Sequence, residues 1–149
     1  MKTKNVIYAD NAATTRLDPL ALEAMLPFLT DNFSNPSALH SFGKTVRKAV
    51  DTARQQIADC IGATPQEIFF TSCGTESDNW AIKGAARCLR EKGSHLITSA
   101  IDHHAVLNSC AALEKEGFQT TLLPVDQHGF VSIDSLNAAV TPRTTFASV

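Results

Sequence analysis

The first half of the chain places its hydrophobic residues at the spacing of α-helices. Leucines and a methionine recur every three or four positions up to residue 29, after Asp18 and Pro19, a favourable N-cap and first helical residue. A second amphipathic pattern covers residues 41–61, and Gly62 follows it as a C-cap. The pattern therefore predicts helices over residues 18–29 and 41–61, joined by a polar loop.

After Gly62 the pattern alternates between short runs of bulky residues and longer stretches at helical spacing. We expect an α/β fold with a mostly parallel sheet flanked by helices, because the two kinds of segment alternate. No repeat or Gly/Ser-rich linker interrupts the sequence, so residues 1–149 are treated as one piece. The predicted strands are 68–71, 96–98, 120–125 and 144–149, with a short extended piece at 129–133. The predicted helices are 75–92 before Gly93, 103–116 before Gly117, and a short one from an Asp134 N-cap to Val140.

Composition narrows the class of protein. The 149 residues are 44% hydrophobic and 19% charged, which is typical of a globular chain rather than a disordered one. Thirteen Lys and Arg against 15 Asp and Glu give a net charge of -2, without the basic excess that nucleic acids or anionic membranes attract. We expect a cytoplasmic protein, since no apolar run is long enough to cross a bilayer and no signal-peptide core follows Met1.

Cysteines and histidines show no metal-ligand spacing. No C-x-x-C motif occurs, and the adjacent pair His103 and His104 would point to different faces of a helix. We expect reduced thiols, three of them in predicted helices, and no metal site. The residues concerned are Cys60, Cys73, Cys88 and Cys110, with His40, His95, His103, His104 and His128.

The predicted strand-to-helix turn at residues 69–79 is the first candidate site. Ligands in open α/β sheets bind beyond the carboxyl ends of the strands. Gly74 would let a ligand approach the backbone, and the amides of Gly74, Thr75 and Glu76 with the Thr75 hydroxyl would form an anion site of phosphate size. The alternative is an ordinary helix cap with acidic residues in the first turn, and position alone does not decide between them.

The next strand-to-helix turn, residues 98–107, is the second candidate. His103 would lie at the mouth of the same cleft, where an imidazole can stack on a planar ligand or move a proton, with Asp102 influencing its charge. Position alone favours the alternative, a solvated histidine at a helix start. Two earlier segments, 8–15 and 32–37, are either substrate-facing loops or satisfied turns, and their composition favours turns.

Taken together, these segments resemble the cysteine desulfurases, which are pyridoxal-phosphate enzymes of the class V, fold type I aminotransferase superfamily. The resemblance spans essentially the whole chain, and its motifs occur in the family's order. It implies that residues 1–149 form the N-terminal segment and an incomplete large cofactor-binding domain of that fold. The segments are Tyr8 to Thr15, Asn35-Pro36-Ser37 with His40, Phe70 to Asn79, and Asp102-His103 before Ala105-Val106-Leu107.

Two stretches are most similar to the NifS branch of these enzymes, which is associated with nitrogen fixation. They are Thr-Ser-Cys-Gly-Thr-Glu-Ser-Asp-Asn at 71–79 and His-Ser-Phe-Gly at 40–43. The resemblance thus favours NifS over the housekeeping IscS branch.

The resemblance also implies roles for individual residues. Gly74 and Thr75 would hold the phosphate of pyridoxal 5'-phosphate, and His103 would stack on its ring and assist proton transfer. Asn11 and Ala12 would lie near the substrate. Residues 35–40 would lie near the subunit interface and the entrance to the active site. Cys73 stands where many relatives carry glycine, and we expect a small buried thiol there rather than the reactive cysteine.

The implied reaction removes sulfur from L-cysteine, giving L-alanine and an enzyme persulfide. An iron-sulfur scaffold protein would accept the sulfur, and the enzyme would be a homodimer. The family's cofactor lysine, pyridine-nitrogen aspartate and persulfide cysteine have no counterpart in this sequence. We therefore expect an N-terminal portion of a desulfurase that is inactive alone. The alternatives are a selenocysteine lyase or SufS-type relative, and a naturally short noncatalytic module that binds phosphorylated small molecules or another subunit.

Overall fold

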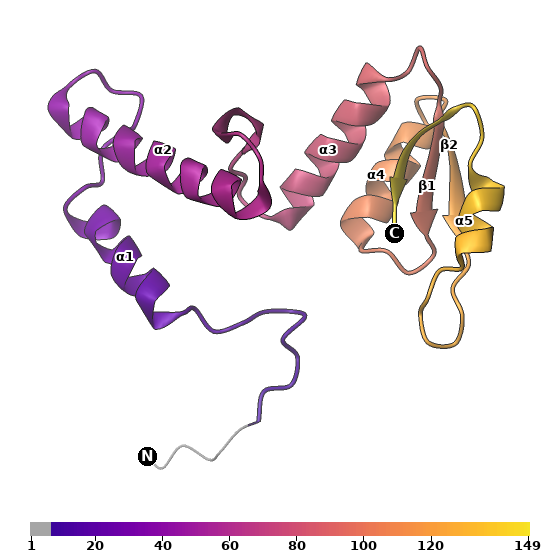
Figure 1. Ribbon diagram of the computed structural model, residues 1–149, viewed down its shortest axis with the longest axis horizontal. Coiled ribbons are helices and arrows are strands. Elements are labelled where there is room, and N and C mark those ends of the chain that lie inside the picture. The colour runs from indigo at the N-terminus through magenta and orange to yellow at the C-terminus, as the bar shows by residue number, and fades with distance from the viewer. Residues whose placement is uncertain (1–6) are drawn as a thin grey trace. The chain divides into compact units, whose positions relative to one another are not determined.

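The computed structural model describes residues 7–149 and divides into two units, one ending at Phe69 and one running from Phe70 to Val149 (Figure 1). No Gly/Ser-rich linker marks this boundary in the sequence. Each unit is described by itself.

The unit that ends at Phe69 contains the two helices predicted from apolar spacing. Helix α1 is Pro19–Thr30, and the carboxylate of Asp18 caps it by accepting a hydrogen bond from the Leu20 amide at 2.8 Å. Helix α2 is Ser41–Ile61, and Gly62 ends it in the left-handed conformation with φ of 68°. Both helices and both predicted caps are confirmed.

Apolar side chains of α1 remain largely exposed. No residue of α1 is buried within the described chain, and Leu20 is 76% exposed. The buried residues of α2 are the small Gly43 and Ala58. This unit therefore presents apolar surface that the described residues do not cover.

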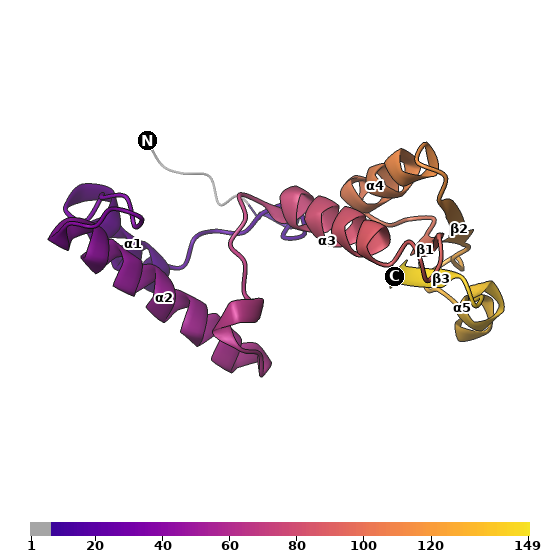
Figure 2. The same cartoon turned by 90° about the horizontal axis from the view of Figure 1, so that it is seen from above.

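The unit from Phe70 to Val149 is built on a three-stranded parallel sheet. Its strands follow the order β2-β1-β3, so β1 lies in the centre. Helices α3 and α4 cover one face of the sheet and α5 lies on the other side (Figure 2). This arrangement confirms the predicted α/β class with helical crossovers. The elements are α3 Gly74–Cys88, β1 His95–Ser99, α4 His104–Glu114, β2 Gln119–Leu123, α5 Ile133–Ala139 and β3 Thr144–Ser148.

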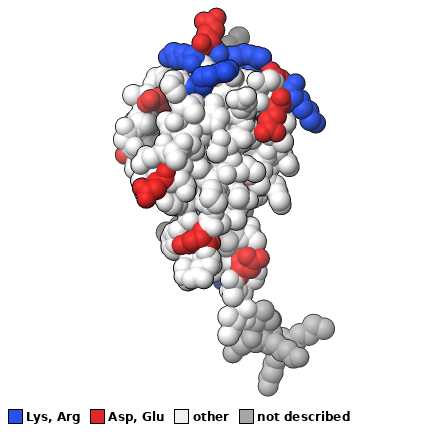
Figure 3. Space-filling view, turned by 90° about the vertical axis from the view of Figure 1, so that its right-hand side faces the viewer, with Lys and Arg blue, Asp and Glu red and all other residues white. Residues whose placement is uncertain are grey.

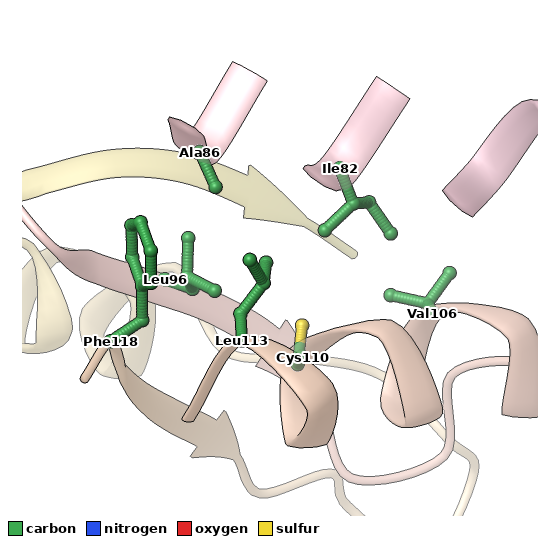
Figure 4. Packing of buried hydrophobic residues seen from close by; sticks show 7 residues of the cluster. All are labelled: Ile82, Ala86, Leu96, Val106, Cys110, Leu113 and Phe118. Atoms are coloured by element: carbon green, nitrogen blue, oxygen red, sulfur yellow. The ribbon is translucent and has the colours of Figure 1, made fainter. Parts of the chain in front are cut away.

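A cluster of apolar side chains joins α3 and α4 to the sheet (Figure 4). Leu96 of β1 is fully buried in it, and every residue of β1 is buried because helices lie on both sides. Burial of one leucine side chain stabilises a fold by about 1.5–3 kcal/mol. The cluster consists of Ile82, Ala86, Leu96, Val106, Cys110, Leu113 and Phe118, with Phe146 packed against it.

The strand predicted at residues 68–71 is wrong. In the described chain this segment belongs to no strand and follows the short 3-10 helix Pro65–Glu67. The Ile68 carbonyl accepts a hydrogen bond from Nε of Arg54 at 3.2 Å, and Phe69 is 65% exposed. A strand needs a neighbouring strand to satisfy its backbone, so bulky residues alone do not form one.

The helices observed at α3 and α4 are shorter than the helices predicted at 75–92 and 103–116. Helix α3 ends at Cys88, before Gly93, and α4 ends at Glu114, before Gly117, which has a positive φ of 91°. Residue 103 lies outside α4 and caps it. At the start of α4, the cap by the His103 side chain sets the boundary.

The remaining predictions hold with local corrections. Strands form where 96–98, 120–125 and 144–149 predict them. Residues 129–133 contribute a single antiparallel bridge, Val125 to Val131, instead of an extended segment. Helix α5 is capped by Ser132 and not by Asp134, because the Ser132 hydroxyl accepts from the Asp134 amide at 3.2 Å. The helix ends at Ala139, one residue before the predicted Val140.

Candidate functional site

The N-terminus of α3 presents backbone amides at the position predicted for an anion. The first backbone hydrogen bond of the helix runs from the Ser77 amide to the Cys73 carbonyl at 3.2 Å, so the amides of Gly74, Thr75 and Glu76 precede it. A Cβ atom placed on Gly74 would meet no described atom within 4 Å. Packing against the described residues therefore does not require glycine at this position.

The thiol of Cys73 is exposed, which corrects the expectation of a buried cysteine. The Glu76 amide, then the Ser72 hydroxyl, lower the pKa of Cys73, while desolvation and the Glu76 charge oppose them. Amides at the positive end of a helix stabilise a thiolate in this way. The exposure follows from the placement of Cys73 as the N-cap residue, outside the helix.

The carboxylate of Glu76 is turned back onto the preceding loop. It accepts hydrogen bonds from the Ser72 amide and the Ser72 hydroxyl, both at 2.7 Å, and these bonds lower the pKa of Glu76. Ser77 and Thr71 join the same turn through their hydroxyls, which lie 2.6 Å apart. The side chains thus brace the loop, while the amides of Glu76 and Thr75 are directed toward the Cys73 sulfur.

These groups fit the phosphate of pyridoxal phosphate. A dianion placed at this helix end would meet amide donors and the positive end of the helix dipole, and the Thr75 hydroxyl is exposed beside them. The acidic side chain in the first turn, Glu76, accepts hydrogen bonds from Ser72. The geometry therefore accommodates the group that the sequence motif suggests.

His103 caps α4, the second helix at this end of the sheet. Its Nδ1 atom accepts a hydrogen bond from the Ala105 amide at 3.1 Å, and the side chain is exposed. The His104 ring lies 6.4 Å from it, centroid to centroid, at a tilt of 48°. The imidazole of His103 is thus held by the helix start and presented to solvent.

Behind His103, the carboxylate of Asp102 joins two strands to the start of α4. Its Oδ2 atom accepts from the hydroxyls of Thr98 on β1 at 2.8 Å and Ser148 on β3 at 3.0 Å. Its Oδ1 atom accepts from the His103 amide at 2.8 Å. Three donors therefore fix this carboxylate at the carboxyl end of the sheet.

The two candidate turns lie at the same end of their unit. Helices α3 and α4 pack against each other, as Ile82 and Val106 in the shared cluster show, and both begin at the end of the unit toward which β1 points (Figure 1). Gly74, Thr75 and His103 thus occupy neighbouring helix starts. This is the edge at which open α/β sheets bind ligands.

The other predicted site residues belong to the unit that ends at Phe69. Asn11 and Ala12 are exposed in a turn closed by the Ala13 amide and the Asp10 carbonyl at 3.2 Å. In the polar loop, the Asn35 side chain accepts from the Ser37 amide at 2.8 Å. Both segments are turns with internal hydrogen bonds, as their composition favours.

The described residues contain no cluster of three or more His, Cys, Asp or Glu side chains placed to hold a metal ion. Nor does any helix among them have the length and apolar content needed to span a membrane. On the face shown in Figure 3, the Lys and Arg side chains gather at the upper end beside acidic ones, and most of the rest is uncharged. That face therefore offers no unbroken basic surface.

Comparison with known proteins decides the family. The sequence profile of the class-V aminotransferases matches residues 7–149. The chain belongs to this family. It is 52% identical over 150 residues to the cysteine desulfurase IscS of Methanosarcina thermophila, a match that covers 100% of this chain and 37% of that protein.

Solved structures of similar proteins agree with the fold. A NifS-like protein is 38% identical, with a TM-score of 0.87 over 93% of this chain and 38% of the other. A structure of SspA in complex with cysteine is 43% identical, with a TM-score of 0.86 over 94% of this chain and 40% of the other. The chain therefore has the pyridoxal-phosphate fold type I architecture over somewhat more than a third of the length of these relatives.

Sequence reasoning missed two features of the candidate site. It placed His103 inside the helix, whereas the structure makes it the N-cap. It also did not link Asp102 to Thr98 or Ser148, because Ser148 lies 46 positions away. The only signal for the N-cap was a polar residue at a helix start. No local signal exists for the contact between Asp102 and Ser148.

Proposed function

We propose that this chain contributes to a pyridoxal-phosphate-dependent cysteine desulfurase, a sulfurtransferase that converts L-cysteine to L-alanine and an enzyme persulfide. The observation that carries the proposal is the pairing of an open helix start at Gly74 with His103 at the same sheet edge. The 52% identity to a cysteine desulfurase over the whole chain supports it. In this proposal residues 1–149 are the N-terminal segment and part of the large cofactor domain.

Gly74 and Thr75 would bind the cofactor phosphate through their amides and the Thr75 hydroxyl. His103 would lie against the ring and move a proton between substrate atoms through its imidazole. Pyridoxal phosphate, when bound, supplies an electron sink for the substrate carbon. Asn11 and Ala12 would face the substrate, and residues 35–40 would lie at the entrance near a second subunit.

The proposal extends to the setting of the enzyme. We place it in the cytoplasm as a homodimer that passes sulfur to an iron-sulfur scaffold protein. The motifs at 40–43 and 71–79 favour the NifS branch, and with it a supply of sulfur for nitrogen fixation. Assays of sulfur transfer to scaffold proteins in the reconstituted full system would decide between NifS and IscS roles.

The phosphate assignment can be tested on the 149-residue chain labelled with ¹⁵N. Inorganic phosphate and pyridoxamine 5'-phosphate are suitable probes, because neither carries an aldehyde that would react with lysines. We expect the amide resonances of Gly74, Thr75 and Glu76 to shift on titration, and Thr75→Val to weaken binding. Unmoved resonances at these residues, with shifts elsewhere, would remove the phosphate assignment.

The activity of the chain alone is a separate matter. We expect the chain to release no L-alanine when it is incubated with L-cysteine and pyridoxal phosphate. Its sequence contains no counterpart of the family's cofactor lysine or persulfide cysteine. Quantifying alanine against a complete cysteine desulfurase as the positive control checks this. Alanine release above the cofactor-only blank would show that residues 1–149 suffice.

A further inference from the structure

We propose that Asp102 is a positioning residue for His103, and that Nε2 is the atom through which His103 exchanges a proton. The inference deepens the proposed function and rests on it, because the proton would be exchanged with the substrate of the proposed desulfurase. It adds a role for a carboxylate that touches neither candidate phosphate donor.

The Asp102 carboxylate links the sheet to the residue that carries the imidazole. Thr98, whose side chain is fully buried on β1, and Ser148 on β3 both donate to Oδ2. The other oxygen, Oδ1, accepts from the amide of His103. The backbone of residue 103 is therefore fixed relative to two strands, and not only to its own helix.

The helix start then fixes the ring. Nδ1 of His103 accepts from the Ala105 amide, and Ala105 is 5% exposed, so this bond is held by a buried residue. A ring nitrogen that accepts a hydrogen bond carries no hydrogen, so the neutral ring carries it on Nε2. Because Nδ1 accepts the hydrogen bond from the Ala105 amide, Nε2 is the ring nitrogen that can exchange a proton.

The chain offers variants that separate positioning from folding. Asp102→Ala removes all three acceptor contacts. Asp102→Asn keeps an oxygen for the His103 amide, and its NH2 group can donate to hydroxyls that rotate to accept. Thr98→Val keeps the volume of a buried side chain and deletes one donor to Asp102. Asp126→Ala is the matched control, since Asp126 is a loop carboxylate of the same unit that accepts from the His128 and Phe130 amides.

The test is the tautomer of His103 in the ¹⁵N-labelled chain without cofactor, read from the ¹⁵N resonances of its two ring nitrogens. In the unsubstituted chain we expect an unprotonated Nδ1 and a protonated Nε2. Asp102→Ala should move the two resonances toward their tautomeric average, and the Ala105 amide should exchange roughly fivefold faster, equivalent to a cap of about 1 kcal/mol. Thr98→Val should move the two ring-nitrogen resonances in the same direction by a smaller amount. Asp102→Asn and Asp126→Ala should leave these resonances as they are in the unsubstituted chain.

Two results would overturn the inference. One is a His103 ring that already shows averaged tautomers, or a hydrogen on Nδ1, in the unsubstituted chain. The other is an unchanged His103 spectrum in both Asp102→Ala and Thr98→Val. Because the measurement uses no cofactor, neither result bears on phosphate binding at Gly74, and a failed phosphate titration leaves this test intact.

Discussion

Arg87 of α3 and Glu116, two residues beyond α4, form a two-pronged ion pair. Nη2 and Nε of Arg87 lie 2.6 Å and 3.1 Å from the two carboxylate oxygens of Glu116. Arg90 donates to the Glu116 carbonyl at 2.8 Å and lies over the Phe118 ring, with 5.2 Å between its guanidinium carbon and the ring centroid. The pair ties together the far ends of the two helices whose starts form the candidate site.

Glu116→Gln should remove a pH-dependent part of the stability. The hydrogen bond from Arg87 is the main cause that lowers the pKa of Glu116, and the same contact raises the pKa of Arg87. A carboxyl whose folded pKa is lowered stabilises the fold above its unfolded pKa of about 4.3 and loses that contribution as pH falls through the folded value.

We therefore expect a lower Tm for Glu116→Gln at pH 7 and a difference that closes below about pH 4. Thermal denaturation across pH measures it. Adding Arg87→Gln to the Glu116→Gln variant should lower the Tm little further, because the ion pair is already broken. A Tm difference that stays constant down to pH 2 would contradict the ion-pair explanation.

Cys73 should be alkylated at lower pH than an ordinary thiol. The Glu76 amide and the Ser72 hydroxyl lower its pKa, and the sulfur is exposed. Cys110 should resist labelling, because it is buried and burial raises its pKa. Iodoacetamide labelling followed by peptide mass spectrometry over pH 5–9 gives each rate.

The exposed Cys60 and Cys88 serve as internal references for that experiment. Cys73→Ser should remove the labelling seen at the lowest pH. If Cys73 instead follows the pH profile of an ordinary thiol, with a midpoint near 8.5, the helix start does not stabilise its thiolate.

Gly93→Ala should destabilise the sheet. A Cβ atom there would overlap the backbone of Arg143, whose carbonyl accepts from the His95 amide at 3.0 Å at the start of β1. Overpacking of this kind costs about 1–3 kcal/mol. Urea denaturation gives the free energy of unfolding.

Gly84→Ala is the matched control for Gly93→Ala. Gly84 is exposed inside α3, where the nearest atom to a new Cβ is Cδ1 of Trp80 at 3.8 Å. Alanine in a helix interior is favoured over glycine by about 0.5–1 kcal/mol, so this variant should be more stable. Equal effects of the two substitutions would show that backbone approach at Gly93 is unimportant.

His95→Leu should weaken the link between the three strands. His95 is buried on β1, and its two ring nitrogens lie 2.8 Å from the hydroxyls of Thr144 on β3 and Thr121 on β2. Deleting one partner of a buried hydrogen bond leaves the other unsatisfied, at a cost of about 1–3 kcal/mol.

The second variant separates hydrogen bonding from packing. His95→Leu combined with Thr121→Val removes both partners of one bond, so it should recover part of the lost free energy of unfolding. Chemical denaturation of both variants measures the recovery. The bond between His95 and Thr121 would contribute nothing if the two substitutions were additive. In that case Thr121→Val would lower the free energy of unfolding by the same amount in the His95→Leu variant as in the unsubstituted chain.

The sequence alone determined the features that depend on near neighbours. The helices at residues 18–29 and 41–61, the caps at Asp18 and Gly62 and the alternation that makes the second unit α/β all follow from residues within a few positions of one another. Helical periodicity and capping act over one or two turns, so the sequence carries them directly.

Only the tertiary structure decided the features that need a distant partner. The bulky residues at 68–71 form no strand, because a strand requires backbone hydrogen bonds to a neighbouring strand and not only residues that favour extended structure. Gly93 is required by the approach of Arg143, and Asp102 is held by Ser148, 46 residues further along the chain. Such contacts are made where the folded backbone brings remote segments together, which no local pattern of residues encodes.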